Sequence, residues 1–248
     1  MRILLTNDDG YNSEGLHAVA DLFKDEHEIA VVAPDVQKSG FSHSLTLRPQ
    51  QITCKEMRGY DYKVYAVGGT PVDCVKFGIS SIFKPDIVIS GINYGRNLGS
   101  DVLYSGTISA AADAAHIGYR AIALSLDIGD DAPTRDEFVR VARFVKDNFD
   151  VLSTIEMPSK TILNVNYPSV PPRGVKVCKL SVLYSFIDIY EHIEGDVYRP
   201  HGHRDYADID KDTDEAYCKD GYITITPVMI DRTDYKLLEK MKKDKFVL

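Results

Sequence analysis

The sequence predicts an α/β fold, doubly wound around a mostly parallel sheet, with a β-rich C-terminal extension. Short, wholly apolar runs recur through the first 180 residues, as expected for strands buried on both faces of a parallel sheet. Segments with helical spacing or helix caps separate several of them. From about residue 175 the pattern changes to strands without intervening helices. We expect one domain over residues 1–248, with the core in about 1–180 and the extension and terminal helix in about 181–248.

The first 34 residues contain a complete β-α-β unit. Residues 3–5 form a short apolar strand, and Asn12 or Ser13 can cap the helix that follows. The apolar residues of this helix have the i, i+3, i+4, i+7 spacing of a buried face: Leu16, Val19, Ala20 and Phe23. A second buried strand covers residues 28–34, and a serine-rich loop at 35–44 leaves its carboxyl end.

The later elements follow the same logic. Residues 51–57 and 63–69 form a strand pair, after which Thr70 and Pro71 begin a helix. The remaining core elements are a strand at 85–91, a loop at 92–104, a helix of small residues at 105–119, a strand at 120–126, an amphipathic helix at 134–149 and a strand at 161–168. In the extension we expect strands over 175–200, an acidic connection, a strand over 221–230 and a terminal helix at 234–244.

Charge and composition limit the classes of partner. The net charge of −8 argues against a nucleic-acid polymer as the main partner, which requires a basic surface. It leaves a phosphorylated small molecule open, because one metal ion can invert the local field. No apolar run approaches about 20 residues, so we expect no membrane partner. The four scattered cysteines and the absence of a signal peptide predict a cytoplasmic protein.

Polar residues gather where predicted strands end, which is where open parallel sheets bind ligands. The first strand ends in "NDDG" with Asp8 and Asp9, the second leads to Ser39, and "SGINYGRN" follows another strand with Asn93 and Asn97. Carboxylate, hydroxyl and amide oxygens suit Mg²⁺ or Mn²⁺. The two acids can converge only if the strand has ended before them.

A fourth segment, "YSGT", opens the helix at 105–119. Ser105, Gly106 and Thr107 would place free backbone N–H groups and two hydroxyls at a helix N-terminus, which favours an anion. Each motif also has a plainer interpretation, since "DDG" is common in turns and "SGT" is a common helix cap. Periodicity and spacing alone support only a candidate phosphate site.

Five blocks of the sequence resemble the ordered signature blocks of the SurE family of metal-dependent nucleoside-monophosphate phosphatases, the 5′/3′-nucleotidases. These blocks are "MRILLTNDDGYNSEGL", "VVAPDVQKSGFSHSLTL", "GGTPVDCVK", "DIVISGINYGRNLGSDVLYSGTISAA" and "GYITITP". The resemblance implies a Rossmann-like core. It also implies a homodimer or homotetramer held partly by exchange of the C-terminal extension.

The resemblance assigns roles position by position. It implies that one divalent metal ion (Mg or Mn) is bound by four ligands: Asp8, Asp9, Ser39 and Asn93. It implies phosphate contacts from Asn97, Ser105, Gly106 and Thr107. The implied reaction is hydrolysis of a nucleoside monophosphate by a metal-activated water, which Asp8 or Asp9 (Asp8 preferred) orients or deprotonates. The helix N-terminus and Asn97 would stabilise charge on the phosphoryl group.

Two other functions remain possible on the sequence. A non-catalytic nucleotide or phosphate sensor could use the same site without turnover. An aspartyl-phosphate phosphatase would use a carboxylate nucleophile, but its acids stand in a DxD pattern rather than side by side. The sequence does not distinguish the base, the 5′ or 3′ position, polyphosphate cleavage or the preferred metal. His43 is either a supporting surface residue or a substrate contact.

Three other features of the sequence give weaker signals. His201 and His203 are two ligands at most, so we expect them to be structural or exposed. The segment 208–215, "DIDKDTDE", lacks the glycine and the glutamate of a calcium loop and is interpreted as a solvated acidic face. There is no Walker P-loop and no GxGxxG after a strand, which disfavours ATP-driven and dinucleotide chemistry.

Overall fold

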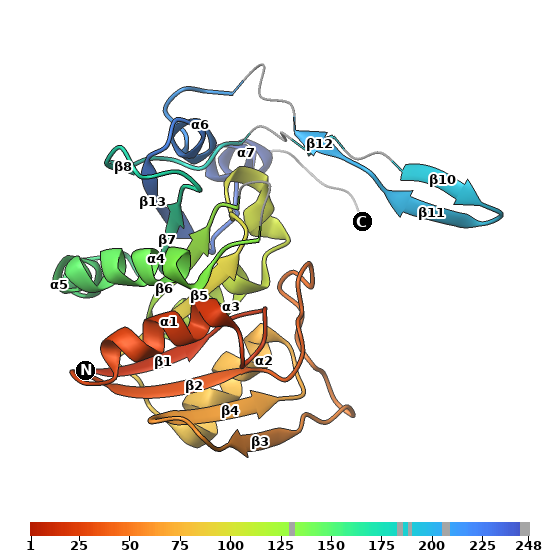
Figure 1. Ribbon diagram of the computed structural model, residues 1–248. Coiled ribbons are helices and arrows are strands. Elements are labelled where there is room, and N and C mark those ends of the chain that lie inside the picture. Colours follow the sequence, from red (N-terminus) through yellow and green to blue (C-terminus); the bar gives the residue numbers. More distant parts are fainter. Residues whose placement is uncertain (129–131, 183–185, 188–189, 205–208, 244–248) are drawn as a thin grey trace.

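A nine-stranded sheet forms the centre of the molecule, with helices on both faces (Figure 1). The computed structural model describes residues 1–128, 132–182, 186–187, 190–204 and 209–243. Six neighbouring strands run parallel: β4 (Lys63–Val67), β2 (Glu28–Pro34), β1 (Arg2–Thr6), β5 (Ile87–Tyr94), β6 (Arg120–Leu126) and β7 (Thr161–Tyr167). Strand β3 (Cys54–Met57) pairs antiparallel with β4 at the edge. The predicted doubly wound, mostly parallel fold is confirmed.

The helices form two layers, one on each face of the sheet. Helices α1 (Glu14–Phe23), α4 (Arg135–Asp147) and α5 (Phe149–Thr154) pack over one apolar cluster. Helices α2 (Pro71–Phe77) and α3 (Gly106–His116) pack over the other. Two short helical turns, η1 (Gly78–Ile82) and η2 (Gly99–Leu103), follow α2 and precede α3. Among the helices that the structure describes, none has the length and apolar character needed to cross a membrane.

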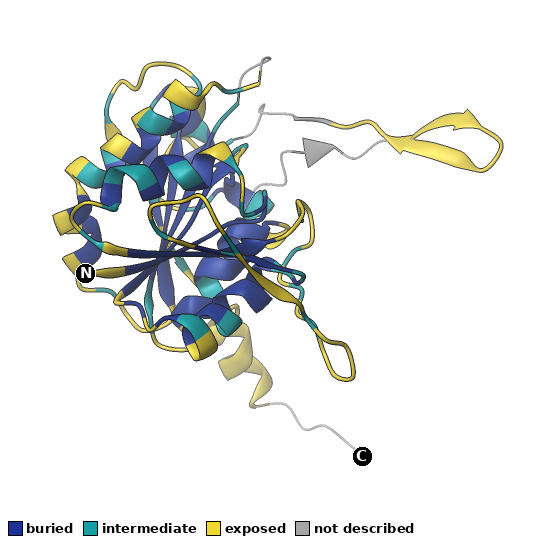
Figure 2. Ribbon diagram, turned by 60° about the horizontal axis from the view of Figure 1, so that its bottom comes forward, coloured by how far each residue is buried: buried dark blue, intermediate teal, exposed yellow. Residues whose placement is uncertain are grey.

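Local sequence signals account for these elements. Leu16, Val19 and Phe23 are fully buried, so the predicted apolar face of α1 is the face that packs on the sheet. Thr70 caps α2 in a capping box with Asp73, as the residue types predict. The predicted helix at 134–149 is divided, because α4 ends at Asp147 and α5 begins at Phe149. Figure 2 shows that the central strands are almost wholly buried.

Strand β5 is longer than predicted. We expected it to end at Gly91, but it runs to Tyr94, so Asn93 lies in the strand rather than in a loop. The pairing with β6 shifts register between Ser90 and Asn93. Gly91 has φ +122°, and a Cβ there would lie 2.2 Å from the carbonyl oxygen of Leu124, so only glycine fits.

The C-terminal extension contributes to the central sheet, a pairing that the sequence does not predict. Strand β13 (Ile223–Met229) lies between β7 and β8 (Val175–Val177), antiparallel to β7 and parallel to β8. Over 175–200, where we expect long strands, the residues that the structure describes contain four separate strands. They are β8, β9 (Phe186–Ile187), β10 (Tyr190–Glu194) and β11 (Val197–Pro200), with β12 (His203–Arg204) just after them. The β10–β11 hairpin projects from the body of the molecule, and α7 (Tyr235–Met241) is exposed (Figures 1 and 2).

The acidic connection before β13 also differs from its prediction. It contains helix α6 (Asp214–Lys219), and Asp214 and Glu215 are buried rather than part of a solvated acidic face. The carboxylate of Asp214 accepts hydrogen bonds from the backbone N–H groups of Gly99, Ser181 and Glu215 at 2.9, 2.8 and 2.9 Å. These three donors compensate the burial of the charge. Asp208 and the side chain of His203 lie outside the described residues, and His201 is exposed.

Candidate active site at the carboxyl end of strand β1

The two adjacent acids lie in a tight turn just after β1, which ends at Thr6. Asn7 closes this turn. Its Oδ1 accepts a hydrogen bond from the N–H of Gly10, and its Nδ2 donates to the carbonyl oxygen of Gly10, both at 3.1 Å. Gly10 has φ +106°, a conformation that favours glycine. Because the strand has ended, Asp8 and Asp9 are not forced onto opposite faces of the sheet.

Asp8 packs against the first turn of α3. Its carboxylate accepts a hydrogen bond from the hydroxyl of Thr107, and only 4% of the residue is exposed. A Cβ on Gly106 would lie 2.8 Å from the Cβ of Asp8 and 3.0 Å from its Oδ2, so the helix can come this close only with glycine there. Burial raises the pKa of Asp8, and the Thr107 hydroxyl offsets part of this rise.

Asp9 lies against the end of β5. Its Oδ2 accepts a hydrogen bond from the backbone N–H of Tyr94 at 3.1 Å, and the side chain of Gln37 also bonds to it. Burial, followed by the negative charge of Asp8, raises the pKa of Asp9 to about 6. The protein therefore holds two carboxylates in a place where their charges repel each other. A cation bound between them would favour the ionised form of both.

Asn93 approaches the same place from β5. It is 8% exposed and directly precedes Tyr94, whose N–H bonds to Asp9. Its Nδ2 donates to the carbonyl oxygen of Gly95 at 2.7 Å. The amide oxygen Oδ1 is therefore the end of the side chain left to bind a cation.

Ser39 approaches from the loop after β2. The N–H of Lys38 donates to the carbonyl oxygen of Asp8 at 2.7 Å, which fixes this loop beside the acids. Gln37 Nε2 donates to Ser39 Oγ at 3.0 Å and also bonds to Asp9. Ser39 is itself exposed. The structure thus brings the four predicted metal ligands to the carboxyl end of the parallel strands: Asp8, Asp9, Ser39 and Asn93. Each of them, or the residue next to it in the chain, makes one of the contacts described above.

The N-terminus of α3 supplies the predicted phosphate-binding residues. Ser105 is the N-cap, and its Oγ accepts a hydrogen bond from the N–H of Ile108 at 3.1 Å. Gly106 and Thr107 form the first turn, directly against Asp8. The positive end of the helix dipole therefore faces the carboxylates and any anion that a cation would hold beside them.

Asn97 has a different environment. It is 5% exposed, and its Nδ2 donates to Ser125 Oγ at 2.8 Å. Its N–H donates to Asn166 Oδ1, and its carbonyl oxygen accepts from Asn164 Nδ2, both at 2.8 Å. These bonds tie the loop after β5 to strands β6 and β7. A contact between Asn97 and a phosphate stays a prediction.

The oxygen ligands fit a small, hard divalent cation. Two carboxylates, one amide oxygen and one hydroxyl form the kind of set that Mg²⁺ or Mn²⁺ uses together with water and substrate oxygens. Across the residues that the structure describes, no group of three or more histidine, cysteine, aspartate or glutamate side chains is arranged to hold a metal. The site at the end of β1 contains two such residues, Asp8 and Asp9, so a metal bound there would also need the neutral oxygens of Ser39 and Asn93.

Sequence reasoning missed two supporting residues. Gln37 links Ser39 with Asp9, and Asn7 shapes the turn that carries both acids. The sequence gives no sign of Gln37, because its role depends on the loop folding back over β1. Asn7 could have been found, because asparagine commonly closes tight turns with its side chain.

His43 lies against α3. Its Nε2 is 3.5 Å from Asp113 Oδ1, and Lys76 Nζ is 3.0 Å from Asp113 Oδ2. The N–H of Ser42 donates to the carbonyl oxygen of Tyr104 at 3.1 Å, which holds this part of the loop at the start of α3. The contact with Asp113 is a supporting contact for His43, and a contact with substrate stays a prediction.

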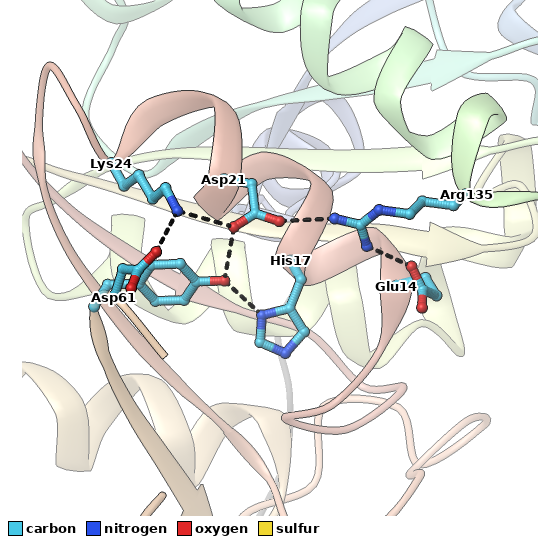
Figure 3. Close-up of polar contacts among 7 residues, drawn as sticks. Glu14, His17, Asp21, Lys24, Asp61 and Arg135 are labelled. Atoms are coloured by element: carbon cyan, nitrogen blue, oxygen red, sulfur yellow. Dashed lines mark hydrogen bonds and ion pairs between the residues drawn. The ribbon is translucent and has the colours of Figure 1, made fainter. Parts of the chain in front are cut away.

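A second polar cluster joins α1 to neighbouring elements (Figure 3). His17 Nδ1 is 2.7 Å from the hydroxyl of Tyr62, and Arg135 bonds to Asp21 at 2.7 Å. The cluster also includes Glu14, Lys24 and Asp61. These contacts connect α1 with α4 and with the turn before β4, so the cluster serves the packing of these elements.

Comparison with known proteins identifies the family. Residues 3–185 match the model of the family described as Survival protein SurE. The chain is 42% identical over 250 residues to the 5′-nucleotidase SurE of Thermoanaerobacter sp. (strain X514), covering 96% of each chain. It is 42% identical over 256 residues to the 5′-nucleotidase SurE of Pelotomaculum thermopropionicum, covering 98% of this chain and 95% of the relative.

A solved structure shows the same fold. The SurE protein of Aquifex aeolicus superposes with a TM-score of 0.82 at 32% identity, covering 98% of each chain. The similarity thus extends well past the core into the C-terminal extension.

Proposed function

This chain belongs to the SurE family, and we propose that it is a metal-dependent 5′-nucleotidase that hydrolyses nucleoside monophosphates to nucleoside and phosphate. Its relatives bear the name 5′-nucleotidase over nearly the full length of this chain. The observation that carries the proposal is the pair Asp8 and Asp9, held at the end of β1 against the N-terminus of α3.

The proposed metal ligands are Asp8, Asp9, Ser39 and Asn93, with one Mg²⁺ or Mn²⁺ as cofactor. A bound divalent cation would neutralise phosphoryl oxygens and lower the pKa of a water near the phosphorus. Asp8 has one oxygen engaged by Thr107, and Asp9 has one engaged by Tyr94, so each carboxylate is oriented by a neighbour. This orientation supports a preorganised site, which lowers the reorganisation needed during reaction.

The remaining residues act on the phosphate. Ser105, Gly106 and Thr107 would present backbone N–H groups and the helix dipole to the phosphoryl oxygens, where negative charge grows during transfer. Asn97 would support this site by fixing the loop after β5. We assign proton acceptance from the attacking water to one of the two aspartates.

The proposal extends to location and assembly. All four cysteines are unpaired thiols, which suits the reducing cytoplasm. We propose a homodimer or homotetramer. The apolar residues Leu237, Leu238 and Met241 of α7 support it, because they are exposed on the single chain. Size-exclusion chromatography with light scattering tests the assembly.

The test is phosphate release from a panel of nucleoside 5′-monophosphates with Mg²⁺, Mn²⁺ or EDTA. We expect activity that EDTA abolishes and added metal restores, and an Asp9→Asn variant that loses activity. Asp150→Asn changes an exposed aspartate on α5 and is the matched control, expected to remain active. Nucleotide binding without phosphate release would favour the sensor instead. Activity that persists in EDTA would contradict the proposal that the reaction needs a divalent metal ion.

A further inference from the structure

Three polar residues form a row across neighbouring strands at the carboxyl end of the sheet. The strand register pairs Asn93 of β5 with Ser125 of β6, and Ser125 with Asn166 of β7. Neighbouring strands lie about 5 Å apart, so this polar row extends about 10 Å from the proposed metal ligand Asn93 to Asn166. Ser125 and Asn166 are fully buried, although neither has been given a role above.

Strand β7 departs from the apolar pattern of a strand that is buried on both faces. Leu163 and Val165 pack in the apolar cluster beneath α1 and α4. On the opposite face Ile162 is apolar too, but the next two positions are Asn164 and Asn166, both fully buried. A buried amide costs free energy unless its oxygen and nitrogen are hydrogen-bonded. The partners of these two side chains therefore indicate their role.

The two amides bind the backbone of Asn97, in the loop after β5. Asn166 Oδ1 accepts a hydrogen bond from the N–H of Asn97 at 2.8 Å, and Asn166 Nδ2 donates to the Asn97 carbonyl oxygen at 3.1 Å. Asn164 Nδ2 donates to the same carbonyl oxygen at 2.8 Å, and its Oδ1 accepts from Asn166 Nδ2 at 3.2 Å. Each side-chain oxygen and nitrogen of the pair thus has a partner. Together these bonds fix the peptide groups on both sides of the Asn97 Cα.

The side chain of Asn97 is held by the same polar row. Its Nδ2 donates to Ser125 Oγ at 2.8 Å, and Ser125 is the register partner of Asn93. Asn97 is 5% exposed, so turning its side chain away would break this bond where little water can replace it. Backbone and side chain of Asn97 are therefore both fixed beside the proposed metal ligand, in the part of the molecule to which the proposed function assigns the phosphate.

We propose that Asn166, supported by Asn164 and Ser125, is a positioning residue that holds Asn97 for contact with the phosphoryl group. This rests on the proposed nucleotidase function. Packing alone would be served by apolar side chains at 164 and 166, as it is on the other face of β7. The amides instead fix one residue of a loop in advance, so that its side chain needs no reorganisation when charge develops on the phosphoryl oxygens.

The test is a double-mutant cycle on phosphate release from adenosine 5′-monophosphate with Mn²⁺. Asn166→Leu keeps the branched shape of the side chain and removes its hydrogen bonds, whereas Asn97→Ala removes the side chain that is positioned and leaves the backbone. We expect kcat to fall about a hundredfold in Asn97→Ala and about tenfold or more in Asn166→Leu. The double variant should lie within about twofold of Asn97→Ala, because Asn166 acts through the side chain that is already gone.

Urea denaturation of the same four proteins distinguishes positioning from a purely structural role. The backbone bonds of Asn97 exist in both backgrounds, so Asn166→Leu should lower the urea midpoint equally in each, although its effect on kcat disappears in one. Val165→Ala is the matched control, because it removes two methyl groups from the same strand on the opposite, fully buried face. It should lower the urea midpoint and leave kcat within about twofold of wild type.

Ser125→Ala is a second variant that removes only a hydroxyl, and it keeps the test decisive if Asn166→Leu does not fold. We expect a smaller loss of kcat, about threefold or more, that is likewise absent in the Asn97→Ala background. The positioning role is overturned, and the nucleotidase function stands, under any of three results. These are variants at 166 and 125 that are as active as Val165→Ala, losses that multiply with that of Asn97→Ala, and an Asn97→Ala variant with full activity. A wild type that releases no phosphate overturns both.

Discussion

The hydrogen bond between Thr107 and Asp8 joins the turn after β1 to α3 and gives a quantitative test of the site. Thr107→Val replaces the hydroxyl with a methyl group of similar shape, and so removes the hydrogen-bond donor. Asp8 is 4% exposed and Thr107 is fully buried, so water cannot replace the lost donor without a rearrangement. A hydrogen bond to a charged group contributes about 1.5–3 kcal/mol. We therefore expect the metal-free variant to lose about 2 kcal/mol of unfolding free energy at pH 8.

Urea denaturation in EDTA measures this loss, and phosphate release with Mn²⁺ measures its effect on activity. Without its hydroxyl partner the Asp8 carboxylate can rotate, so we expect kcat/KM to fall about tenfold or more. Thr107→Ser is the matched control, because it keeps the hydroxyl and loses one buried methyl group, at a cost of about 1 kcal/mol. It should keep most of the activity. The reasoning is refuted if the valine variant is as active as the wild type, or if the serine variant is as inactive as the valine variant.

Three further predictions concern other parts of the chain. Gly106→Ala places a Cβ 2.8 Å from the Cβ of Asp8. We expect urea denaturation to show about 1–3 kcal/mol of destabilisation and calorimetry to show weaker Mn²⁺ binding. Unchanged values would show that α3 does not pack tightly against Asp8. Asp214→Asn replaces a buried carboxylate that accepts hydrogen bonds from three backbone N–H groups, one of them from Gly99, and should lower the unfolding free energy by about 2–3 kcal/mol in urea denaturation. A variant as stable as wild type would contradict this account of the acidic segment. Burial lowers the pKa of His17 below 6.5, so as pH falls below that value the unfolded chain binds a proton that the folded chain does not, and stability is lost. Wild type should therefore lose more stability than His17→Phe between pH 7.5 and 5, and equal losses would contradict the shift.

The parallel core could be predicted because its signals are local. The wholly apolar runs of β1 and β2, the spacing of α1 and the cap at Thr70 each depend on residues near in sequence. The end of β5 was placed too early, because Gly91 looks like a strand breaker when the neighbouring strand is unknown. In the fold, that glycine lets the backbone pass the carbonyl of Leu124, and the strand continues to Tyr94.

The extension was predicted less well, because its structure depends on contacts between distant residues. Strand β13 has a recognisable strand pattern, but nothing local shows that it joins the central sheet beside β7. Asp214 and Glu215 stand in an acidic segment that local composition assigns to the surface. Their burial depends on partners such as Gly99, which lies 115 residues away in the chain. A buried charge that is compensated by hydrogen bonds from distant residues leaves no periodic pattern in the sequence.

The candidate site falls between these two cases, because its residues are recognisable in the sequence but the contacts that hold them are long-range. Those contacts explain why adjacent acids can stand where a buried strand ends. The motifs gave the residue types, but only the fold shows what restrains the pair. Thr107 orients Asp8, Tyr94 orients Asp9, and burial together with mutual repulsion raises the pKa of Asp9 to about 6. Because each carboxylate is held by a different element, the pair cannot relieve its repulsion by turning apart without breaking a hydrogen bond. A divalent cation bound between the two carboxylates would relieve that repulsion with those bonds intact, so the restraints on the pair support the proposed metal site.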